Sequence, residues 1–64
     1  MVKVNGTEID VAGKTVAEYL ALADYDLKRV AVECNGNIIP KDLYQETILK
    51  NGDSLEVVSF VGGG

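Results

Sequence analysis

The stretch TVAEYLALA, residues 15–23, is the part of this chain in which apolar residues recur with a helical period. They stand at i, i+3, i+4 and i+7, the spacing of one face of an α-helix: Val16, Tyr19, Leu20 and Ala23. Thr15 and Glu18 match a capping box, in which each side chain accepts a hydrogen bond from a backbone amide of the other residue. The sequence therefore predicts one helix, which ends at Asp-Tyr-Asp, residues 24–26.

The segments on either side of this helix alternate apolar and polar residues, a pattern typical of β-strands. Before it, MVKVNGTEIDVAG (residues 1–13) predicts two short strands joined at an Asn-Gly dipeptide, the second ending at Gly13. After it, RVAVECNGNIIP (residues 29–40) predicts a strand, a second Asn-Gly turn and a brief strand that Pro40 stops. Asn-Gly suits the positive φ angles of a two-residue hairpin turn. Two hairpins are therefore expected.

Residues 41–61 complete the prediction of the fold. Residues 41–50 fit either a single helical turn or an irregular crossing loop, and SLEVVSFV (residues 54–61) predicts a last strand. Two hairpins that flank one helix indicate an α+β protein, with a mixed four- to five-stranded sheet and the helix packed across one face. The first and last strands are expected side by side at the centre, which is the β-grasp (ubiquitin-like) arrangement. We predict one domain over residues 1–61 and a flexible C-terminal glycine tail over residues 62–64.

The charge and composition argue against several classes of function. The net charge of −4 over 64 residues disfavours binding to phosphate backbones, so we expect no nucleic acid and instead a protein partner with a basic docking surface. The six cations are scattered along the sequence, and only Lys28 and Arg29 are adjacent. No apolar run is long enough to cross a bilayer and no signal-peptide pattern is present, which predicts a soluble, cytoplasmic protein that binds no membrane.

The single cysteine and the absence of histidine argue against catalysis by this chain. Cys34 has no partner for an intrachain disulfide, and one thiol cannot hold a thiolate metal cluster. Without histidine, the usual general base that would activate the thiol is missing. The alternating pattern places Cys34 on the inward face of its strand, so we interpret it as a structural thiol. We expect no enzymatic activity, no metal and no bound cofactor.

The last predicted strand carries apolar residues on both of its faces. If Leu55 faces the helix, Val58 and Phe60 lie on the opposite face, which is otherwise polar. We expect Ala31 to extend this apolar patch and Val61 to complete it beside Phe60. Scattered exposed apolar residues are common on soluble proteins, but an apolar patch rimmed by charge often marks a docking surface. We therefore predict that these residues bind a partner: Val58, Phe60, Val61 and Ala31.

The sequence ends in three glycines, Gly62-Gly63-Gly64, for which two interpretations stay open. The glycines are either a slack end or the flexible carrier of a reactive carboxylate. A carboxylate must be activated before it can transfer an acyl group, for instance as an acyl-adenylate made from ATP. Glycine lacks a Cβ atom, so such a tail fits a narrow enzyme channel and adopts the φ and ψ angles that the channel imposes.

Two motifs carry a resemblance to a known family: VAVECNGNIIP (residues 30–40) and NGDSLEVVSFVGGG (residues 51–64). Both are similar to the ThiS family of sulfur carrier proteins in thiamin biosynthesis, which are bacterial relatives of ubiquitin. The resemblance covers the whole chain. It implies a β-grasp body and a C-terminal glycine that is charged with sulfur.

The resemblance also implies a reaction and its partners. A ThiF-like adenylating enzyme, which uses ATP and Mg²⁺, would convert the carboxylate of Gly64 to an acyl-adenylate. Sulfur, drawn from cysteine through a cysteine desulfurase, would replace AMP and leave a thiocarboxylate, which a ThiG-like thiazole synthase would use as sulfur donor. Gly64 is then the modified residue, Gly62 and Gly63 form its tail, and the chain acts as a co-substrate. The alternatives are a sulfur carrier for molybdopterin or cysteine synthesis, conjugation to protein lysines, and an unmodified β-grasp interaction domain.

Overall fold

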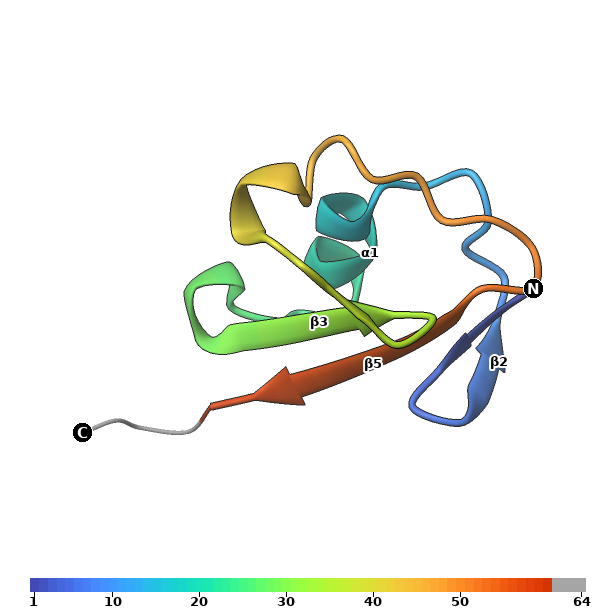
Figure 1. The fold of residues 1–64 in the computed structure, drawn as a ribbon, viewed down its shortest axis with the longest axis horizontal. Coiled ribbons are helices and arrows are strands. Elements are labelled where there is room, and N and C mark those ends of the chain that lie inside the picture. The colour runs from blue at the N-terminus through green and yellow to red at the C-terminus, as the bar shows by residue number, and fades with distance from the viewer. Residues whose placement is uncertain (61–64) are drawn as a thin grey trace.

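The computed structural model describes residues 1–60, which form a five-stranded sheet with one α-helix across one face (Figure 1). The strands lie in the order β2-β1-β5-β3-β4. Their bounds are β1 Val2–Val4, β2 Thr7–Ile9, β3 Val30–Cys34, β4 Asn37–Ile39 and β5 Ser54–Ser59. β1 and β5 run parallel, and the other neighbouring pairs are antiparallel. The predicted mixed sheet, with its first and last strands side by side, is confirmed.

Both predicted Asn-Gly turns join antiparallel strands. In the first turn the φ angles are 50° at Asn5 and 86° at Gly6, and in the second they are 53° at Asn35 and 85° at Gly36. Positive φ at both central residues is the requirement of the type I′ turn, whose twist matches that of the strands it connects. The local chemistry of two dipeptides therefore sets the register of both hairpins.

The second strand is shorter than the sequence pattern predicts. β2 ends at Ile9 and does not continue to Gly13. Val11 is nevertheless buried, because the chain turns inward after the strand, with the Val11 amide donating to the Ile9 carbonyl at 3.1 Å. The amide of Gly13 then donates to the carbonyl of Leu49 at 2.8 Å. Apolar and polar residues alternate over residues 9–11 because Val11 is buried beneath the segment that contains Leu49, and not because these residues pair in a strand.

The helix α1, Val16–Leu22, has the predicted capping box. The Glu18 amide donates to Thr15 Oγ1 at 3.1 Å, and the Thr15 amide donates to Glu18 Oε1 at 2.8 Å. Val16 and Leu20 are buried against the sheet, as is Tyr19, whereas Ala23 is exposed and lies beyond the helix. The predicted apolar face is therefore one residue too long.

The end of α1 explains why Ala23 leaves the apolar face. Asp24 adopts a positive φ of 64°, so the chain reverses into a left-handed conformation directly after Ala23. The amides of Asp24 and Tyr25 donate to the carbonyls of Ala21 and Leu20 at 3.2 and 2.9 Å, which is the hydrogen-bond pattern of a Schellman motif. The predicted helix end at residues 24–26 is confirmed.

Residues 41–50 contain both of the alternatives predicted for them. A 3₁₀ turn, Lys41–Leu43, is followed by an irregular segment that crosses over the helix side of the molecule (Figure 1). Tyr44 and Leu49 from this segment are buried in the core, while Leu43 and Ile48 are exposed. A second 3₁₀ turn, Leu27–Arg29, precedes β3. Within residues 1–60, no helix has the length and apolar character that crossing a membrane requires.

The side chain of Asn5 extends the pairing between β1 and β5. Its Oδ1 accepts from the Val57 amide at 2.8 Å, and its Nδ2 donates to the Val57 carbonyl at 3.2 Å. We predict that Asn5→Gly, which preserves the positive φ angle, lowers the free energy of unfolding by about 1–3 kcal/mol, because two partly buried backbone groups lose their partners. Urea unfolding followed by circular dichroism measures this change. An Asn5→Gly protein as stable as the unsubstituted protein would show that the two bonds contribute nothing.

Candidate docking face and reactive tail

The sheet face turned away from α1, here called the outer face, carries the predicted apolar patch. In β5, Leu55 and Val57 are buried toward the helix, while Glu56 and Val58 are exposed on the other side. The predicted division of the strand into two faces is therefore confirmed. Val58 is 53% exposed and lies directly opposite Ala31 of β3, which is half-buried.

Phe60 follows β5 and lies where the described chain ends. Its amide donates to the Arg29 carbonyl at 2.7 Å, which continues the β3–β5 pairing by one step, and the residue is 56% exposed. The structure thus brings Phe60, Val58 and Ala31 to the same end of the sheet. Val61 and the predicted glycine tail, residues 62–64, lie outside the described residues. Partner binding by this patch stays a prediction.

Ile38 belongs to the same face and was not predicted there. It lies opposite Glu33 in the β3–β4 pair and is 76% exposed, whereas its neighbour Ile39 is buried. Adjacent residues of a strand point to opposite faces, so an Ile-Ile pair must expose one of its members. That signal was present in the sequence. We call the set Ala31, Ile38, Val58 and Phe60 the docking face.

A hollow of about 250 Å³, here called the Phe60 pocket, opens beside the docking face. It lies between β3, β4, the 3₁₀ turn that follows β4, and Phe60. Pro40 and Lys41 line it together with Ile38, Ala31, Tyr44 and Phe60. Most of these side chains are apolar, and Lys41 is the charged residue among those that line the hollow. The hollow therefore combines apolar walls with one positive charge.

Lys41 is distant from Lys28 in sequence but reaches its backbone in space. Lys41 Nζ donates to the Lys28 carbonyl at 3.0 Å, so the ammonium group of Lys41 lies beside the backbone that leads into β3. The turn after β4 returns Lys41 to the start of β3. Arg29 Nε lies 3.7 Å from Asp26 Oδ2, so the charge of Arg29 is already partnered.

Negative charge lies further along the same face. Glu33 and Glu56 are directly opposite each other in the β3–β5 pair, and both are exposed. Like charges at facing positions of neighbouring strands repel each other. The outer face is thus acidic in its middle, whereas Lys41 lines the hollow at the end where Phe60 lies. A partner whose surface charges are complementary to this distribution binds in one orientation.

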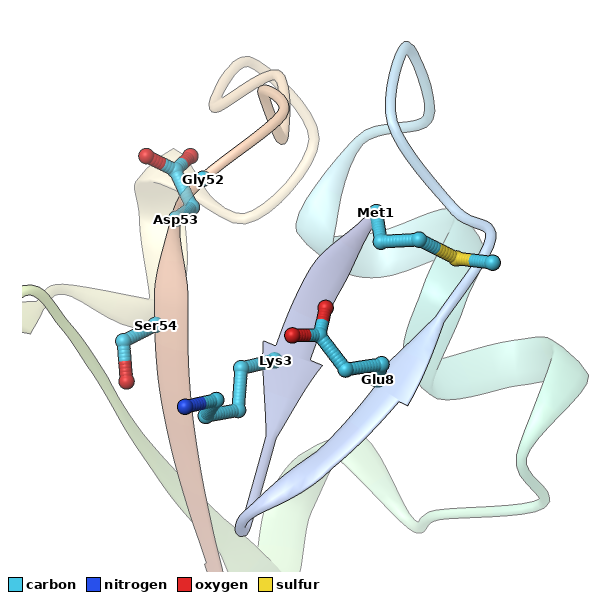
Figure 2. A pocket seen from close by; sticks show the side chains of 6 residues that line it. All are labelled: Met1, Lys3, Glu8, Gly52, Asp53 and Ser54. Carbon is cyan, nitrogen blue, oxygen red and sulfur yellow. The ribbon is translucent and has the colours of Figure 1, made fainter.

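The opposite end of the outer face is polar. Figure 2 shows Lys3, Glu8, Asp53 and Ser54 around a second hollow, of about 190 Å³, which Met1 and Gly52 also line. Lys3 lies between its two pairing partners, Glu8 of β2 and Ser54 of β5. Because β5 starts at Ser54 and ends at Ser59, this polar hollow is at the end of the sheet remote from Phe60. Lys3 and Glu8 are both exposed on this polar part of the outer face.

Cys34 is half-buried at the end of β3 and packs against the core. Desolvation raises the pKa of its thiol, and the carboxylate of Asp53 raises that pKa further. A higher pKa leaves less of the nucleophilic thiolate at neutral pH. The burial is less complete than the sequence pattern predicts, because Cys34 is the last residue before the hairpin turn. The environment of the thiol fits a structural role.

Comparison with known proteins assigns the chain to a family. The model of the ThiS family matches residues 2–64. The sulfur carrier protein ThiS of Bacillus subtilis is 41% identical, and the match covers both chains in full. The crystal structure of the thiamine biosynthesis protein ThiS from Geobacter metallireducens is similar with a TM-score of 0.76 and 36% identity, covering 98% of this chain and 97% of that one.

A longer protein contains a similar segment. A thiazole synthase of Paramagnetospirillum magneticum is 42% identical over 62 residues, which cover 95% of this chain but only 19% of that protein. The family match, the two ThiS relatives and the shared fold agree with one another and confirm the predicted resemblance. This chain therefore belongs to the ThiS family.

Proposed function

We propose that this chain is a sulfur carrier protein that supplies sulfur for the thiazole ring of thiamin. The observation that carries the proposal is the family match, which runs from residue 2 through the terminal glycines. A full-length relative named as a sulfur carrier supports it, as does the similar segment within a thiazole synthase. The chain would act as a co-substrate of enzymes in the cytoplasm.

The proposed reaction takes place at the carboxylate of Gly64. A carboxylate oxygen attacks the α-phosphorus of ATP, and pyrophosphate leaves with its Mg²⁺. The terminal sulfur of a persulfide, supplied through a cysteine desulfurase, then attacks the carbonyl carbon, and AMP leaves with one of the original carboxylate oxygens. A thiol then reduces the S–S bond of the resulting acyl disulfide, which releases the sulfur on the glycine and leaves the thiol oxidised as a disulfide. The product is a thiocarboxylate, which donates its sulfur to thiazole synthase. ATP and Mg²⁺ belong to the adenylating enzyme, and this chain needs no cofactor of its own.

The folded body would hold the tail at that enzyme. Ordering three glycines in an active-site channel opposes binding, because glycine loses more conformational entropy than any other residue. Contacts made by the docking face offset this loss. Phe60 and Val58 suit that role, because both are more than half exposed and lie at the end of β5 that leads to the tail. Val61 is part of the same proposed surface.

Intact-mass measurement tests the proposed reaction. We predict that incubation of the full chain with the adenylating enzyme, ATP, Mg²⁺ and a sulfur source raises the mass by the difference between one sulfur and one oxygen. Fragmentation should locate the change at Gly64, and omission of ATP is the matched control. An unchanged last residue in cells that are making thiazole would contradict the proposal.

A further inference from the structure

The Phe60 pocket has a size and chemistry that suit a protein side chain. Its volume of about 250 Å³ lies below the range of about 300–1,000 Å³ that is common for small-molecule sites. Its walls include Pro40, Ile38 and Phe60. Interfaces often concentrate binding energy where an apolar anchor of one protein fills such a hollow on the other. The pocket thus fits one aliphatic or aromatic side chain of a partner.

Lys41 adds a charge requirement at the rim of this pocket. An ammonium group has three donors, and one of them is used by the bond to the Lys28 carbonyl. Within residues 1–60, the pair of Arg29 and Asp26 is the one ion pair, so no carboxylate of this region lies within 4.0 Å of Lys41 Nζ. Two donors therefore remain for an acceptor from outside, and the bond to Lys28 already restricts the position of the side chain.

The cationic rim contrasts with the rest of the protein. The chain has a net charge of −4, yet Lys41 lines the hollow beside Phe60 and its ammonium group bonds to the backbone of Lys28. A basic partner surface would meet repulsion here, although it would suit Glu33 and Glu56 further along the face. The local charge therefore selects a negative group at the Phe60 end, next to the apolar anchor.

We propose that the Phe60 pocket receives an apolar side chain of the adenylating enzyme, while Lys41 pairs with a carboxylate of the enzyme that lies next to that side chain. This inference rests on the proposed carrier function and names the chemistry of the partner surface. The contact at Lys41 fixes the orientation of the folded body together with basic groups of the enzyme that face Glu33 and Glu56. The tail then starts from a defined position.

Charge variants of the full chain test this inference. We predict that Lys41→Glu weakens binding to the adenylating enzyme by about tenfold or more, because two carboxylates then face each other at a desolvated contact. Lys41→Gln removes the charge without reversing it and should weaken binding about threefold. Lys14→Glu is the matched control, because it makes the same change in net charge at an exposed residue beside α1. It should change binding less than twofold. Titration calorimetry measures all four proteins.

A charge exchange identifies the enzyme residue. Acidic residues of the enzyme surface are changed singly to lysine, and the correct partner is the one whose change restores binding of Lys41→Glu. Equal affinities of the Lys41→Glu and Lys14→Glu proteins would overturn the inference, as would a loss of binding to thiazole synthase alone. Mass measurement on the unsubstituted chain separates failure of the Lys41 contact from failure of the carrier function. If Gly64 carries a thiocarboxylate and Lys41→Glu binds normally, only the Lys41 contact is refuted. Absence of both binding and modification refutes the carrier function as well.

Discussion

Deletion of Gly63 and Gly64 should leave a protein that folds and still binds the adenylating enzyme but accepts no sulfur. The core is built from residues between Val2 and Val57, so its packing does not depend on the last two residues. The new carboxylate, at Gly62, falls short of the original position by about 7 Å, the length of two extended residues. Displacement of a reacting group by only about 1 Å can lower a rate roughly a hundredfold. Sulfur transfer should therefore fall below detection.

Three measurements on the truncated protein separate binding from chemistry. Titration calorimetry should show that most of the affinity for the adenylating enzyme remains, because the docking face is intact. Intact mass should show no thiocarboxylate, and the variant should not rescue a strain that lacks the carrier and requires thiamin. Addition of one glycine after Gly64 is the matched control, since it preserves every native residue and moves only the carboxylate. Rescue by the truncated protein would favour the unmodified interaction domain.

The elements that the sequence predicted correctly depend on neighbouring residues. Each hairpin turn requires positive φ angles that Asn-Gly supplies by itself, at Asn5 and again at Asn35. The capping box at Thr15 joins residues only three positions apart. The two faces of β5 follow from the strand period alone. The order of these elements then leaves few ways to build one sheet under one helix, so the overall architecture could also be predicted.

The features that escaped prediction depend on contacts between distant residues. β2 stops at Ile9 because the following residues turn toward the segment around Leu49, and no local signal marks that turn. Lys41 joins Lys28 only because a 3₁₀ turn returns the chain to the start of β3. The Phe60 pocket has the same origin, since β3, β4 and Phe60, which follows β5, all contribute to it. The sequence indicated three apolar residues of the docking face, but neither Ile38 nor the position of Lys41 beside them.

Substitution of Phe60 by alanine should weaken binding to the adenylating enzyme by about thirtyfold. Aromatic residues at the centre of an interface can contribute about 2 kcal/mol or more, and Phe60 is both exposed and next to the tail. The fold should be little affected, because the ring is 56% exposed and the amide bond to Arg29 does not involve the side chain. Calorimetry measures the affinity, and thermal unfolding verifies that the variant is folded. Sulfur transfer at subsaturating enzyme should fall in proportion.

Leu22→Ala is the matched control for this substitution. Leu22 is 66% exposed and lies on α1, on the opposite side of the sheet. The substitution therefore removes a similar apolar area from a different surface. Its affinity should stay within twofold of the unsubstituted protein. If Phe60 and Lys41 contact the same group of enzyme residues, their effects on the binding free energy should not add. The double variant Phe60→Ala with Lys41→Glu should then lose less binding free energy than the sum of the two single losses. Equal effects of Phe60→Ala and Leu22→Ala would contradict docking through this face, because apolar area would then matter without regard to its position.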